Sequence, residues 1–517
     1  MAYRLTEAIE RAKKEAEWYK VSTAQPSSSA AQLVVNTVDN RGVCVVQGPP
    51  GTGKTHVLEQ AIDTVMRKLD KGELVLYVAS TNKLVYDMFY RLTKRLYQKG
   101  YRDSDVKRMI RVYGSKFDYS GSEVLGKDID EHTHIVLATS YQKRVHGDLI
   151  KEVHIMVDEA SRSRLYEPII DIVPLLINAV EKGRSINGSL SVVGDPMQAI
   201  GLGELYVVKR HKRVEHLLEE KILHSLLELR GLQPSKEPLI LTRMAREHLR
   251  GQHYEFLDIT YRLPEPTERP ISEGYYDGEL RAKYKASDKL ADVDYFGPRH
   301  ELLKDPYFSL AFSLVEELVT TKRSLLVIET RSRYAVSDLG LRYDPTRAKI
   351  GSVVGVSIVA STGLRTYVIS PYRDMVQQMK LFTKRFYSHH LGVLRDNLVF
   401  DTVHSTLGSE ADAVVAILGR EDFDPENKTV YFQEPELFNV QLSRHKRMLV
   451  LIGDPVKLLR EAERADQEMN STQYRPIRTT IKRLLELVGV EDVDSKGEMS
   501  LAKKKETDAG IFFRLNA

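Results

Sequence analysis

The stretch Gly48–Thr55 constrains this chain more than any other, because it fits the pattern G-x-x-x-x-G-K-[ST] of a phosphate-binding loop. The residues before it, Gly42–Gln47, have the composition of a buried strand, and those after it, His56–Ile62, have the composition of a helix. Glycines let the backbone curl round a phosphate with successive N–H groups pointing inward. The sequence therefore predicts a strand, a P-loop and a helix in this order.

The chemistry of the loop predicts a nucleotide site. The helix that follows adds the positive end of its dipole. We expect Lys54 to reach the β- and γ-phosphates of ATP, and the Thr55 hydroxyl to bind Mg²⁺. A chance glycine loop is the alternative, and the strand and helix around the motif argue against it. The predicted nucleotide-binding residues of the loop are Gly48, Pro49, Pro50, Gly51, Thr52, Gly53, Lys54 and Thr55.

Two later apolar runs end in residues that suit hydrolysis. The run Val153–Val157 leads directly into Asp158 and Glu159. We expect Asp158 to hold Mg²⁺ and Glu159 to take the proton of the attacking water. An exposed acidic pair that opens a helix is the alternative reading. The run Leu190–Val193 ends in the sequence GDPMQ, whose last residue, Gln198, is a candidate sensor of the γ-phosphate.

Small polar residues follow two more predicted strands, Leu74–Ala79 and Ile135–Ala138. The carboxyl ends of parallel strands are where open α/β sheets bind ligands. We therefore predict that these residues contact the phosphate backbone of a nucleic acid, and a plain turn or helix cap is the alternative. Upstream of the P-loop, Gln32 is either a solvated side chain or an amide that reads adenine. The predicted nucleic-acid contacts here are Ser80, Thr81, Asn82, Thr139 and Ser140.

The order of these motifs resembles that of the superfamily 1 helicases, in particular the branch typified by the up-frameshift helicase of nonsense-mediated decay. The resemblance runs from about Gln32 to Leu459. An ordered set of eight motifs is far more specific than a P-loop alone. The motifs are GPPGTGKT at 48–55, DEAS at 158–161, GDPMQ at 194–198, ITYRL at 259–263, YYDGEL at 275–280, VISPY at 368–372, VHSTLGSEAD at 403–412 and NVQLSRHKR at 439–447.

The resemblance implies further roles. Tyr261 would stack on the adenine beside Gln32. Arg262 and Arg444 would reach the γ-phosphate, because a guanidinium pairs with phosphate oxygens and stays charged. Gly408 and Glu410 would lie by the ribose and phosphates. In the second domain, the residues implied to touch the nucleic-acid strand are Tyr372, Thr402 and His404. The resemblance also implies ATP and Mg²⁺ as cofactors.

The chain departs from the family's pattern at four positions, which carry Thr260, His404, Leu407 and Lys446. These residues bear on how hydrolysis is coupled to strand movement. Upstream of Gln32 the sequence predicts one helix and a linker, and it contains one cysteine, Cys44. We therefore expect a compact motor without the barrel and the Cys/His-rich domain of the family's founding member.

A chain of 517 residues predicts at least two domains. We predict an N-terminal helix and a RecA-like domain at 1–255, with a mostly helical insertion at 205–250 whose start is basic. A second RecA-like domain is predicted at 256–465, and a helix with a flexible tail at 466–517. The fold class is therefore α/β, with two tandem RecA-like parallel-sheet P-loop domains. In the second domain the predicted strands are 325–328, 355–359, 367–370, 398–400, 413–417 and 448–452.

The composition bears on the cellular location and the partners of the protein. The single cysteine excludes a disulfide framework, no apolar run is long enough to span a bilayer, and a cytoplasmic location follows. The net charge of +4 permits a nucleic-acid partner without requiring one. We expect a monomer that contacts a protein or ribonucleoprotein partner through the insertion or the tail.

Two main hypotheses of function follow. The first is an ATP-dependent helicase that moves 5′→3′ on single-stranded RNA or DNA, with ATP held between the two domains and cleft closure driving each step. The second is an ATPase that clamps a nucleic acid or ribonucleoprotein without unwinding it. A third and less favoured class is a P-loop NTPase that acts on protein alone.

Overall fold

The chain folds into two compact units in a computed structural model. The first unit contains residues 1–49, 53–196 and 200–257, and the second contains residues 50–52, 197–199 and 258–517. Two short segments of the predicted nucleotide site, 50–52 and 197–199, thus group with the second unit. The structure describes residues 3–16, 28–113, 117–118, 129–139, 151–162, 187–198, 217–297, 302–331, 334–336, 342–387, 396–424, 429–469, 472–490 and 504–515.

The first unit is built on a parallel sheet of seven described strands in the order β4-β6-β3-β7-β8-β2-β9. The strands expected beside the P-loop and before the polar motifs are all present. The sheet therefore confirms the predicted α/β class for this unit. Its strands are β2 (Val43–Gln47), β3 (Glu73–Ala79), β4 (Ile110–Tyr113), β6 (Ile135–Thr139), β7 (Glu152–Asp158), β8 (Asn187–Gly194) and β9 (Tyr254–Phe256).

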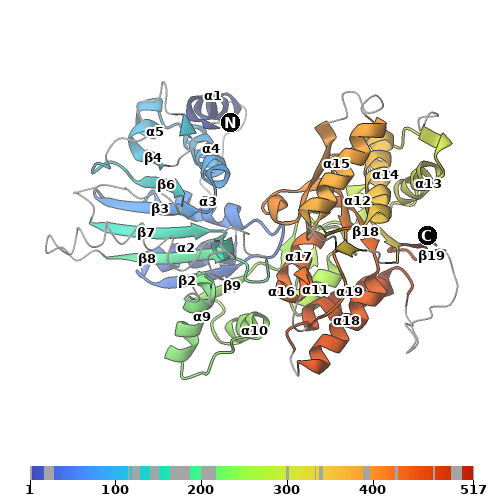
Figure 1. Cartoon of the computed structure of the whole chain (residues 1–517). Helices are drawn as coiled ribbons and strands as arrows, with labels where there is room; N and C mark the ends of the chain where they lie inside the picture. Colours follow the sequence, from blue (N-terminus) through green and yellow to red (C-terminus); the bar gives the residue numbers. More distant parts are fainter. Residues whose placement is uncertain are drawn as a thin grey trace. The chain divides into compact units, whose positions relative to one another are not determined.

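Apolar side chains cover both faces of this sheet, as parallel strands require. On one face, Val46, Tyr77 and Leu137 pack with helices that flank the P-loop strand. On the other face, Leu76, Val78 and Val136 form a second buried cluster. The helices of the first cluster are α1 (Leu5–Ala16), α2 (Ser29–Asp39), α3 (Lys54–Val65), α4 (Asn82–Gln98) and α5 (Asp103–Met109) (Figure 1).

The predicted helical insertion contains two described helices, α9 (Leu218–Leu229) and α10 (Pro238–His248), which are drawn in green in Figure 1. Leu218 of α9 packs with Val157, Ala160 and Val192, so this helix covers the end of β7 and β8. The basic residues expected at the start of the insertion, 209–213, lie outside the described residues.

The second unit has its own sheet of seven described strands, in the order β16-β15-β17-β18-β12-β20-β19. All neighbouring pairs are parallel except β19 and β20. Five predicted strands are confirmed here, and with them the second RecA-like sheet. The strands are β12 (Leu325–Glu329), β15 (Thr366–Ser370), β16 (Leu398–Thr402), β17 (Ala411–Ile417), β18 (His445–Gly453), β19 (Lys504–Glu506) and β20 (Gly510–Arg514).

The strand predicted at Gly355–Val359 is wrong, because these residues belong to helix α14 (Pro345–Thr362). Every residue of this helix from 350 to 362 is buried, so its sequence lacks the polar face that identifies a helix. Two glycines let it lie close to the sheet. A Cβ on Gly351 would stand 2.3 Å from Ile417 Cδ1, and one on Gly355 would stand 2.5 Å from Val368 Cγ2.

The prediction of a flexible tail is also wrong for residues 504–515. Strand β20 lies between β12 and β19, and Phe512 is paired in register with Val327. The side chain of Phe512 is 0% exposed. The lysine-rich segment before it suggested a solvated tail, but the antiparallel edge strand β19 carries those lysines and leaves the apolar triplet Ile511–Phe513 in the core.

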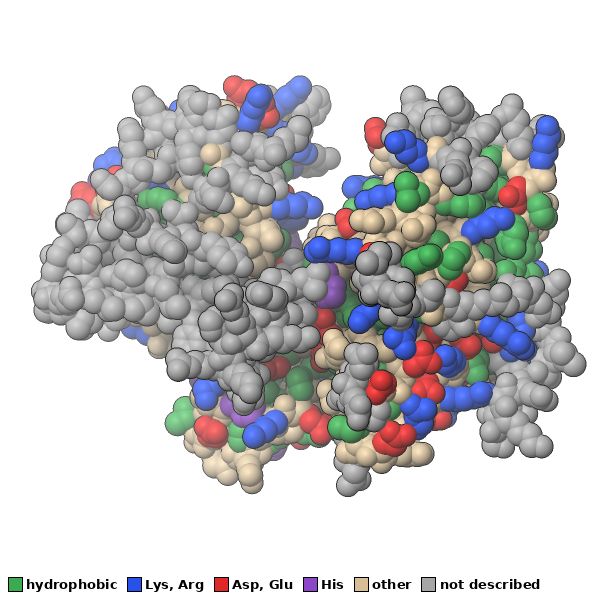
Figure 2. Space-filling view, viewed as in Figure 1, with side chains coloured by type: hydrophobic (Ala, Val, Ile, Leu, Met, Phe, Trp, Pro, Cys, Tyr) green, Lys and Arg blue, Asp and Glu red, His purple; other side chains and the backbone are tan. Residues whose placement is uncertain are grey.

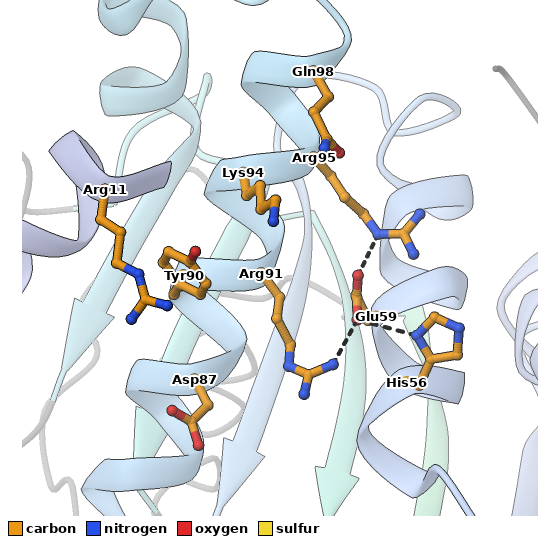
Figure 3. A pocket seen from close by; sticks show the side chains of 9 residues that line it. All are labelled: Arg11, His56, Glu59, Asp87, Tyr90, Arg91, Lys94, Arg95 and Gln98. Atoms are coloured by element: carbon orange, nitrogen blue, oxygen red, sulfur yellow. Dashed lines mark hydrogen bonds and ion pairs between the residues drawn. The ribbon is translucent and has the colours of Figure 1, made fainter. Parts of the chain in front are cut away.

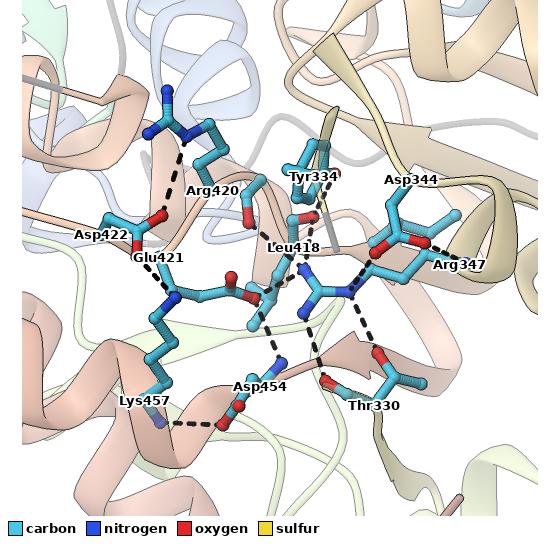
Figure 4. A network of polar contacts seen from close by, with 12 residues as sticks. Thr330, Tyr334, Asp344, Arg347, Leu418, Arg420, Glu421, Asp422, Asp454 and Lys457 are labelled. Carbon is cyan, nitrogen blue, oxygen red and sulfur yellow. Dashed lines mark hydrogen bonds and ion pairs between the residues drawn. The ribbon is translucent and has the colours of Figure 1, made fainter. Parts of the chain in front are cut away.

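A buried ion pair organises the carboxyl end of the second sheet (Figure 4). Arg347 of α14 is fully buried, and its Nη1 lies 2.6 Å from Glu421 Oε1. The same guanidinium donates to the side chain and the carbonyl of Thr330, which follows β12. Glu421 in turn accepts from the backbone N–H of Asp454, which follows β18. The pair therefore ties α14 to the ends of three neighbouring strands.

Phe512→Ala tests the placement of the C-terminal strand. We expect the free energy of unfolding of the second unit to fall by about 3–5 kcal/mol, because a buried aromatic side chain leaves a cavity. Urea titration followed by tyrosine fluorescence and circular dichroism measures this loss. Phe296→Ala is the matched control, since Phe296 is 70% exposed. Equal stability of the two variants would contradict an interior β20.

Candidate nucleotide site

Strand register brings the motifs of the first unit to one edge of its sheet. Ala79 at the end of β3 pairs with Thr139 on one side and with Asp158 on the other. Asp158 pairs in turn with Val193, and Gln47 pairs with Gly194. The P-loop, the acidic motif, the GDPMQ segment and the polar residues after β3 and β6 therefore all leave the sheet at its carboxyl edge, where open α/β sheets bind ligands.

The P-loop leads directly into α3. Gly53 has a φ of 90°, which a residue with a side chain rarely adopts, and it caps the helix that begins at Lys54. Lys54 Nζ donates to the Gly48 carbonyl at 2.5 Å and lies 3.4 Å from the Pro49 carbonyl. The Gly48 N–H donates to the Gly194 carbonyl at 2.8 Å. The lysine ammonium is thus held over the loop whose backbone is shaped for phosphate.

The acidic motif meets the P-loop helix through a direct hydrogen bond. Thr55 Oγ1 donates to Asp158 Oδ2 at 2.9 Å, and the Tyr77 hydroxyl donates to the same oxygen at 2.8 Å. Asp158 is fully buried, and burial together with the nearby charge of Glu159 raises its pKa to about 6, although the two hydroxyl donors act in the opposite direction. The arrangement gathers two hard oxygen ligands at one point.

Glu159 has an unusual backbone conformation. Its φ is 49°, in the left-handed region that residues with a side chain seldom occupy, and its N–H donates to Asp158 Oδ1 at 2.9 Å. Strain of this kind persists only where surrounding contacts hold it, and it gathers at functional sites. The turn directs the chain from β7 into η1 (Ala160–Arg162).

The segment Gly194–Asp195 connects the P-loop with the acidic motif. Asp195 Oδ1 accepts from Gln47 Nε2 at 3.2 Å, and the Asp195 N–H donates to Ser161 Oγ at 3.2 Å. Gln47 also accepts from the Tyr254 hydroxyl at 2.5 Å. Three loops of the candidate site are therefore joined by hydrogen bonds at one point, which we call the Gly194–Asp195 junction.

A buried carboxylate links α3 to α4 behind the P-loop (Figure 3). Glu59 of α3 pairs with Arg91, with Arg95 and with His56. Burial opposes its charge, but hydrogen bonds from His56 and Arg95 outweigh burial and lower the pKa of Glu59 to about 2. These side chains line a pocket of about 600 Å³. The network fixes the P-loop helix against the helix that begins at Asn82.

The two candidate arginines of the second unit have different polar partners. Arg262 Nε pairs with Glu410 Oε2 at 2.9 Å, and Lys446 pairs with the other oxygen of this carboxylate at 2.9 Å. Burial of Glu410 is outweighed by these two cations, so its pKa is lowered. Arg444 is buried, and its Nη2 lies 3.4 Å from Gln198 Oε1, which belongs to the same unit.

The P-loop residues that group with the second unit also contact the segment before Arg262. Thr260 Oγ1 donates to the Pro50 carbonyl at 2.9 Å, and the Tyr261 N–H donates to the Gly51 carbonyl at 3.0 Å. A Cβ on Gly51 would stand 2.3 Å from Arg262 Cβ, so this position has room only for glycine. Thr260, which replaces the glutamine of the family's pattern, therefore has a direct contact with the P-loop tip.

The structure places the expected nucleic-acid contacts of the first unit near one another, after β3 and β6. Thr81 caps α4, because its hydroxyl accepts a hydrogen bond from the Leu84 N–H. The alternative interpretation of this residue as a helix cap is therefore correct for its hydroxyl. Ser80 Oγ and Asn82 Oδ1 are buried atoms without a hydrogen-bond partner in the described part of the chain. Thr139 is buried at the end of β6, and Ser140 lies outside the described residues. Their contact with nucleic acid stays a prediction.

The expected contacts of the second unit are mostly covered by protein. Ser370 pairs with Thr402 across the sheet, which brings Tyr372 and His404 to the same edge. The Tyr372 hydroxyl accepts from the Arg420 N–H, and His404 Nε2 lies 3.0 Å from Glu434 Oε2. Tyr372 and Thr402 are buried. These three residues therefore lie at the carboxyl edge of the second sheet. Their direct contact with nucleic acid remains a prediction.

The remaining predicted residues differ in exposure. Tyr261 is 52% exposed, which suits a ring that stacks on a base. Gln32 is exposed on α2, where its amide donates to Asn36. Gly408 has a φ of 74° in the turn before Glu410. These three also stay predictions.

Two family models match the chain, and each is described as an AAA domain. AAA_11 matches residues 25–179, and AAA_12 matches residues 239–456. This pair is the signature of the up-frameshift-like branch of the superfamily 1 helicases. The chain is a superfamily 1 helicase of this branch. Membership of this family agrees with the P-loop and the acidic motif at one sheet edge.

Solved structures with similar folds include two crystal structures of the DUF1998 helicase MrfA. One is bound to DNA and AMPPNP, with 12% identity, a TM-score of 0.39 and coverage of 99% of this chain and 62% of that chain. The other is bound to DNA, with 12% identity, a TM-score of 0.40 and coverage of 99% and 59%. The helicase thus spans about three fifths of the length of these chains.

A third similar structure is a variant of Dbp5 from S. cerevisiae bound to Nup159, a Gle1 variant, IP6 and ADP. It shares 10% identity with this helicase at a TM-score of 0.35, and the match covers 93% of this chain and 99% of that chain.

Charges on the visible face of the second unit of the helicase are mixed rather than gathered by sign (Figure 2). Figure 2 shows basic and acidic side chains interspersed on the visible face of this unit. Along α18 (Pro455–Glu468), for example, Arg464 pairs with Glu461 and Glu468. This part of the described surface therefore resembles an ordinary solvated face. Of the described helices, none is long and apolar enough to cross a membrane.

Sequence reasoning missed three buried polar residues of the helicase's first unit. Tyr77 lies in an apolar run and gave no polar signal, although it donates to Asp158. Glu59 lies in helix α3, about one turn after the P-loop. A solvated glutamate could occupy the same position, so the sequence does not reveal that Glu59 is buried. Glu219 resembles the other acids that open a helix, yet it is completely buried. Only the three-dimensional packing distinguishes these residues.

Tyr77→Phe tests whether the second donor to Asp158 matters. We expect the rate of ATP turnover at saturating ATP to fall about 10-fold or more if Asp158 binds the metal as predicted, because groups that orient a metal ligand carry effects of that size. The rate is measured with a coupled phosphate-release assay. Tyr284→Phe is the control, since Tyr284 is exposed on the second unit. An unchanged rate for Tyr77→Phe would remove the hydroxyl from the site.

Proposed function

We propose that this chain is an ATP-driven motor that moves 5′→3′ along single-stranded RNA or DNA. The observation that carries the proposal is the hydrogen bond between Thr55 and Asp158 at 2.9 Å, with Glu159 next in the chain. A P-loop hydroxyl, a carboxylate and a general base at one sheet edge are the parts that phosphoryl transfer to water needs. The ordered family motifs in both units support a nucleic-acid track.

The donor set suits Mg²⁺. Thr55 Oγ1 and Asp158 Oδ2 are hard oxygen ligands, and no group of three or more His, Cys, Asp or Glu able to hold a metal occurs among the described residues. Proteins usually bind Mg²⁺ through only one or two side chains, and phosphates and waters complete its coordination shell. We propose that these two residues hold the ion, directly or through water. A bound Mg²⁺ would neutralise charge on the β- and γ-phosphates during transfer.

The chain's own residues would share the remaining work. The P-loop amides and Lys54 would bind the β- and γ-phosphates, so Lys54 would exchange the Gly48 carbonyl for phosphate oxygen. Glu159 would accept the proton of the attacking water. Arg262 and Arg444 would stabilise the charge of the transition state, and Gln198 would sense the γ-phosphate. Tyr261 and Gln32 would hold the adenine, with Gly408 and Glu410 near the ribose and phosphates.

The nucleic-acid strand would contact the residues that follow β3, β6, β15 and β16. Hydroxyl and amide groups there suit phosphate and sugar oxygens, so we expect little sequence preference and strong dependence on salt. The proposal leaves RNA and DNA as equal candidates. We further propose a monomer in the cytoplasm, which agrees with the single cysteine, Cys44, buried in β2.

A clamping ATPase that does not unwind is the second candidate. It is favoured by the departures from the family pattern in the second unit. His404 stands where the pattern has aspartate and is held by Glu434, and Leu407 stands where the pattern has glutamine. Changes at these positions leave the nucleotide residues intact and alter the link between the nucleotide and the strand. Such a protein would bind tightly and release slowly without separating a duplex.

Lys54→Ala and Glu159→Gln test the assignment of the nucleotide site. We expect each to lower ATP turnover by about 10²-fold or more, because one removes the phosphate-binding cation and the other the general base. Turnover is measured with and without single-stranded RNA and DNA of matched sequence. Lys71→Ala is the control, because Lys71 is exposed and lies outside the site. Intact turnover in either site variant would refute the assignment.

A partial duplex distinguishes the motor from the clamp. We expect ATP-dependent release of the paired strand from a substrate with a 5′ single-stranded overhang, and no release from one with a 3′ overhang. A fluorescence assay with a labelled short strand measures the release. Release from the 3′ substrate alone would reverse the proposed direction. Tight, ATP-modulated binding without release from either substrate would favour the clamp.

A further inference from the structure

Glu219 is the least expected charged residue of the first unit. It lies in the first turn of α9, and its side chain is 0% exposed. Neither carboxyl oxygen has a hydrogen-bond partner among the described residues. The neighbouring Glu220 already caps the helix by accepting from the Leu217 N–H at 3.0 Å. Capping therefore does not explain Glu219, and a buried carboxyl without a partner is costly enough to require another reason.

The carboxyl points at the junction of three site loops. A Cβ built on Gly194 would stand 2.8 Å from Glu219 Oε1, 3.1 Å from the Ser161 backbone nitrogen and 3.2 Å from that of Ala160. The carboxyl oxygen and the two amides of η1 thus surround the same small space beside Gly194. Any side chain at position 194 would fill this space and push Glu219 away.

This space lies beside the Gly194–Asp195 junction described above. The Gly194 carbonyl accepts from the Gly48 N–H of the P-loop, and the Asp195 N–H donates to Ser161 of the acidic motif. A small displacement of this junction would therefore move both the phosphate-binding loop and the turn that carries Glu159. Glu219 is the polar side chain of α9 that touches this junction.

The charges around Glu219 favour its neutral form. Burial raises its pKa to about 8, and the negative charges of Glu220 and Asp195 act in the same direction, while the backbone N–H of Glu219 and the charge of Lys54 oppose them. On η1 the facing groups are the two amides, and on β8 and its end they are Gly194 and Asp195.

We propose that Glu219 is a positioning residue for ATP hydrolysis, whose neutral carboxyl supports the Gly194–Asp195 junction and so holds the P-loop and the Glu159 turn in register. The inference rests on the proposed roles of Lys54, Asp158 and Glu159. A neutral acid fills the space as a compact polar group that can donate a hydrogen bond. An ionised carboxylate would place a further negative charge beside Asp195, and it would loosen the junction.

The pH profile of ATP turnover tests this role. We expect the wild-type rate to fall as the pH rises through about 8, the value at which Glu219 ionises. Glu219→Gln keeps the shape of the neutral acid and cannot ionise, so the ratio of its rates at pH 9 and pH 7 should exceed the wild-type ratio by about threefold or more. Glu228→Gln is the matched control, because Glu228 is exposed on the same helix. A parallel fall in wild type and Glu219→Gln would overturn the proposal.

Thermal unfolding without nucleotide provides a second test that needs no turnover. An acid whose pKa is raised by folding destabilises the folded state as the pH rises from the unfolded value of 4.5 towards 8. We therefore expect Glu219→Gln to exceed wild type in unfolding temperature by a margin that grows between pH 5 and pH 8 and then levels off. A constant margin would overturn the proposal, even if wild type showed no turnover and the proposed function itself had failed.

Discussion

The hydrogen bond between Thr55 and Asp158 depends on the register of four strands, and the rest of the candidate site depends on that bond. Thr55 lies in the first turn after the P-loop, and Asp158 is the last residue of β7. They meet because β2, β8, β7 and β3 are parallel neighbours whose carboxyl ends are aligned within a residue. A slip of one residue would turn Asp158 to the opposite face of the sheet. The apolar contacts on both faces of the strands are therefore what positions the chemistry.

Much of this arrangement can be predicted from the sequence, because the signals for it lie in short continuous stretches of the chain. The strand, loop and helix around Gly48–Thr55 each have a strong signal, and β7 runs directly into its acidic pair. The errors arise where a signal is not local. Helix α14 is buried on all sides, so its apolar run looks like a strand until the glycines at 351 and 355 are seen to pack on the sheet. Strand β20 depends on pairing with β12, nearly two hundred residues earlier in the chain.

Buried charges mark the second limit of sequence reasoning, because burial is a property of the fold. The molecule handles three of them differently. Arg347 is paired with Glu421 and hydrogen-bonded to Thr330, and it serves as a structural tie. Glu59 is held by two arginines and a histidine, which keep it ionised. Glu219 has no hydrogen-bond partner among the described residues, and burial raises its pKa to about 8. In the sequence, all three look like ordinary residues of solvated helices.

The contacts of Arg262 show how the second unit balances the charge of Glu410. Its guanidinium is paired with Glu410, and Lys446 shares the same carboxylate. Arg262 Nε donates to Glu410 Oε2 at 2.9 Å, and its Nη1 donates to the Ser443 carbonyl at 3.2 Å. Glu410 therefore has two cationic partners, which outweigh its burial and lower its pKa. The lysine that replaces arginine in the family's pattern keeps a positive charge at this position.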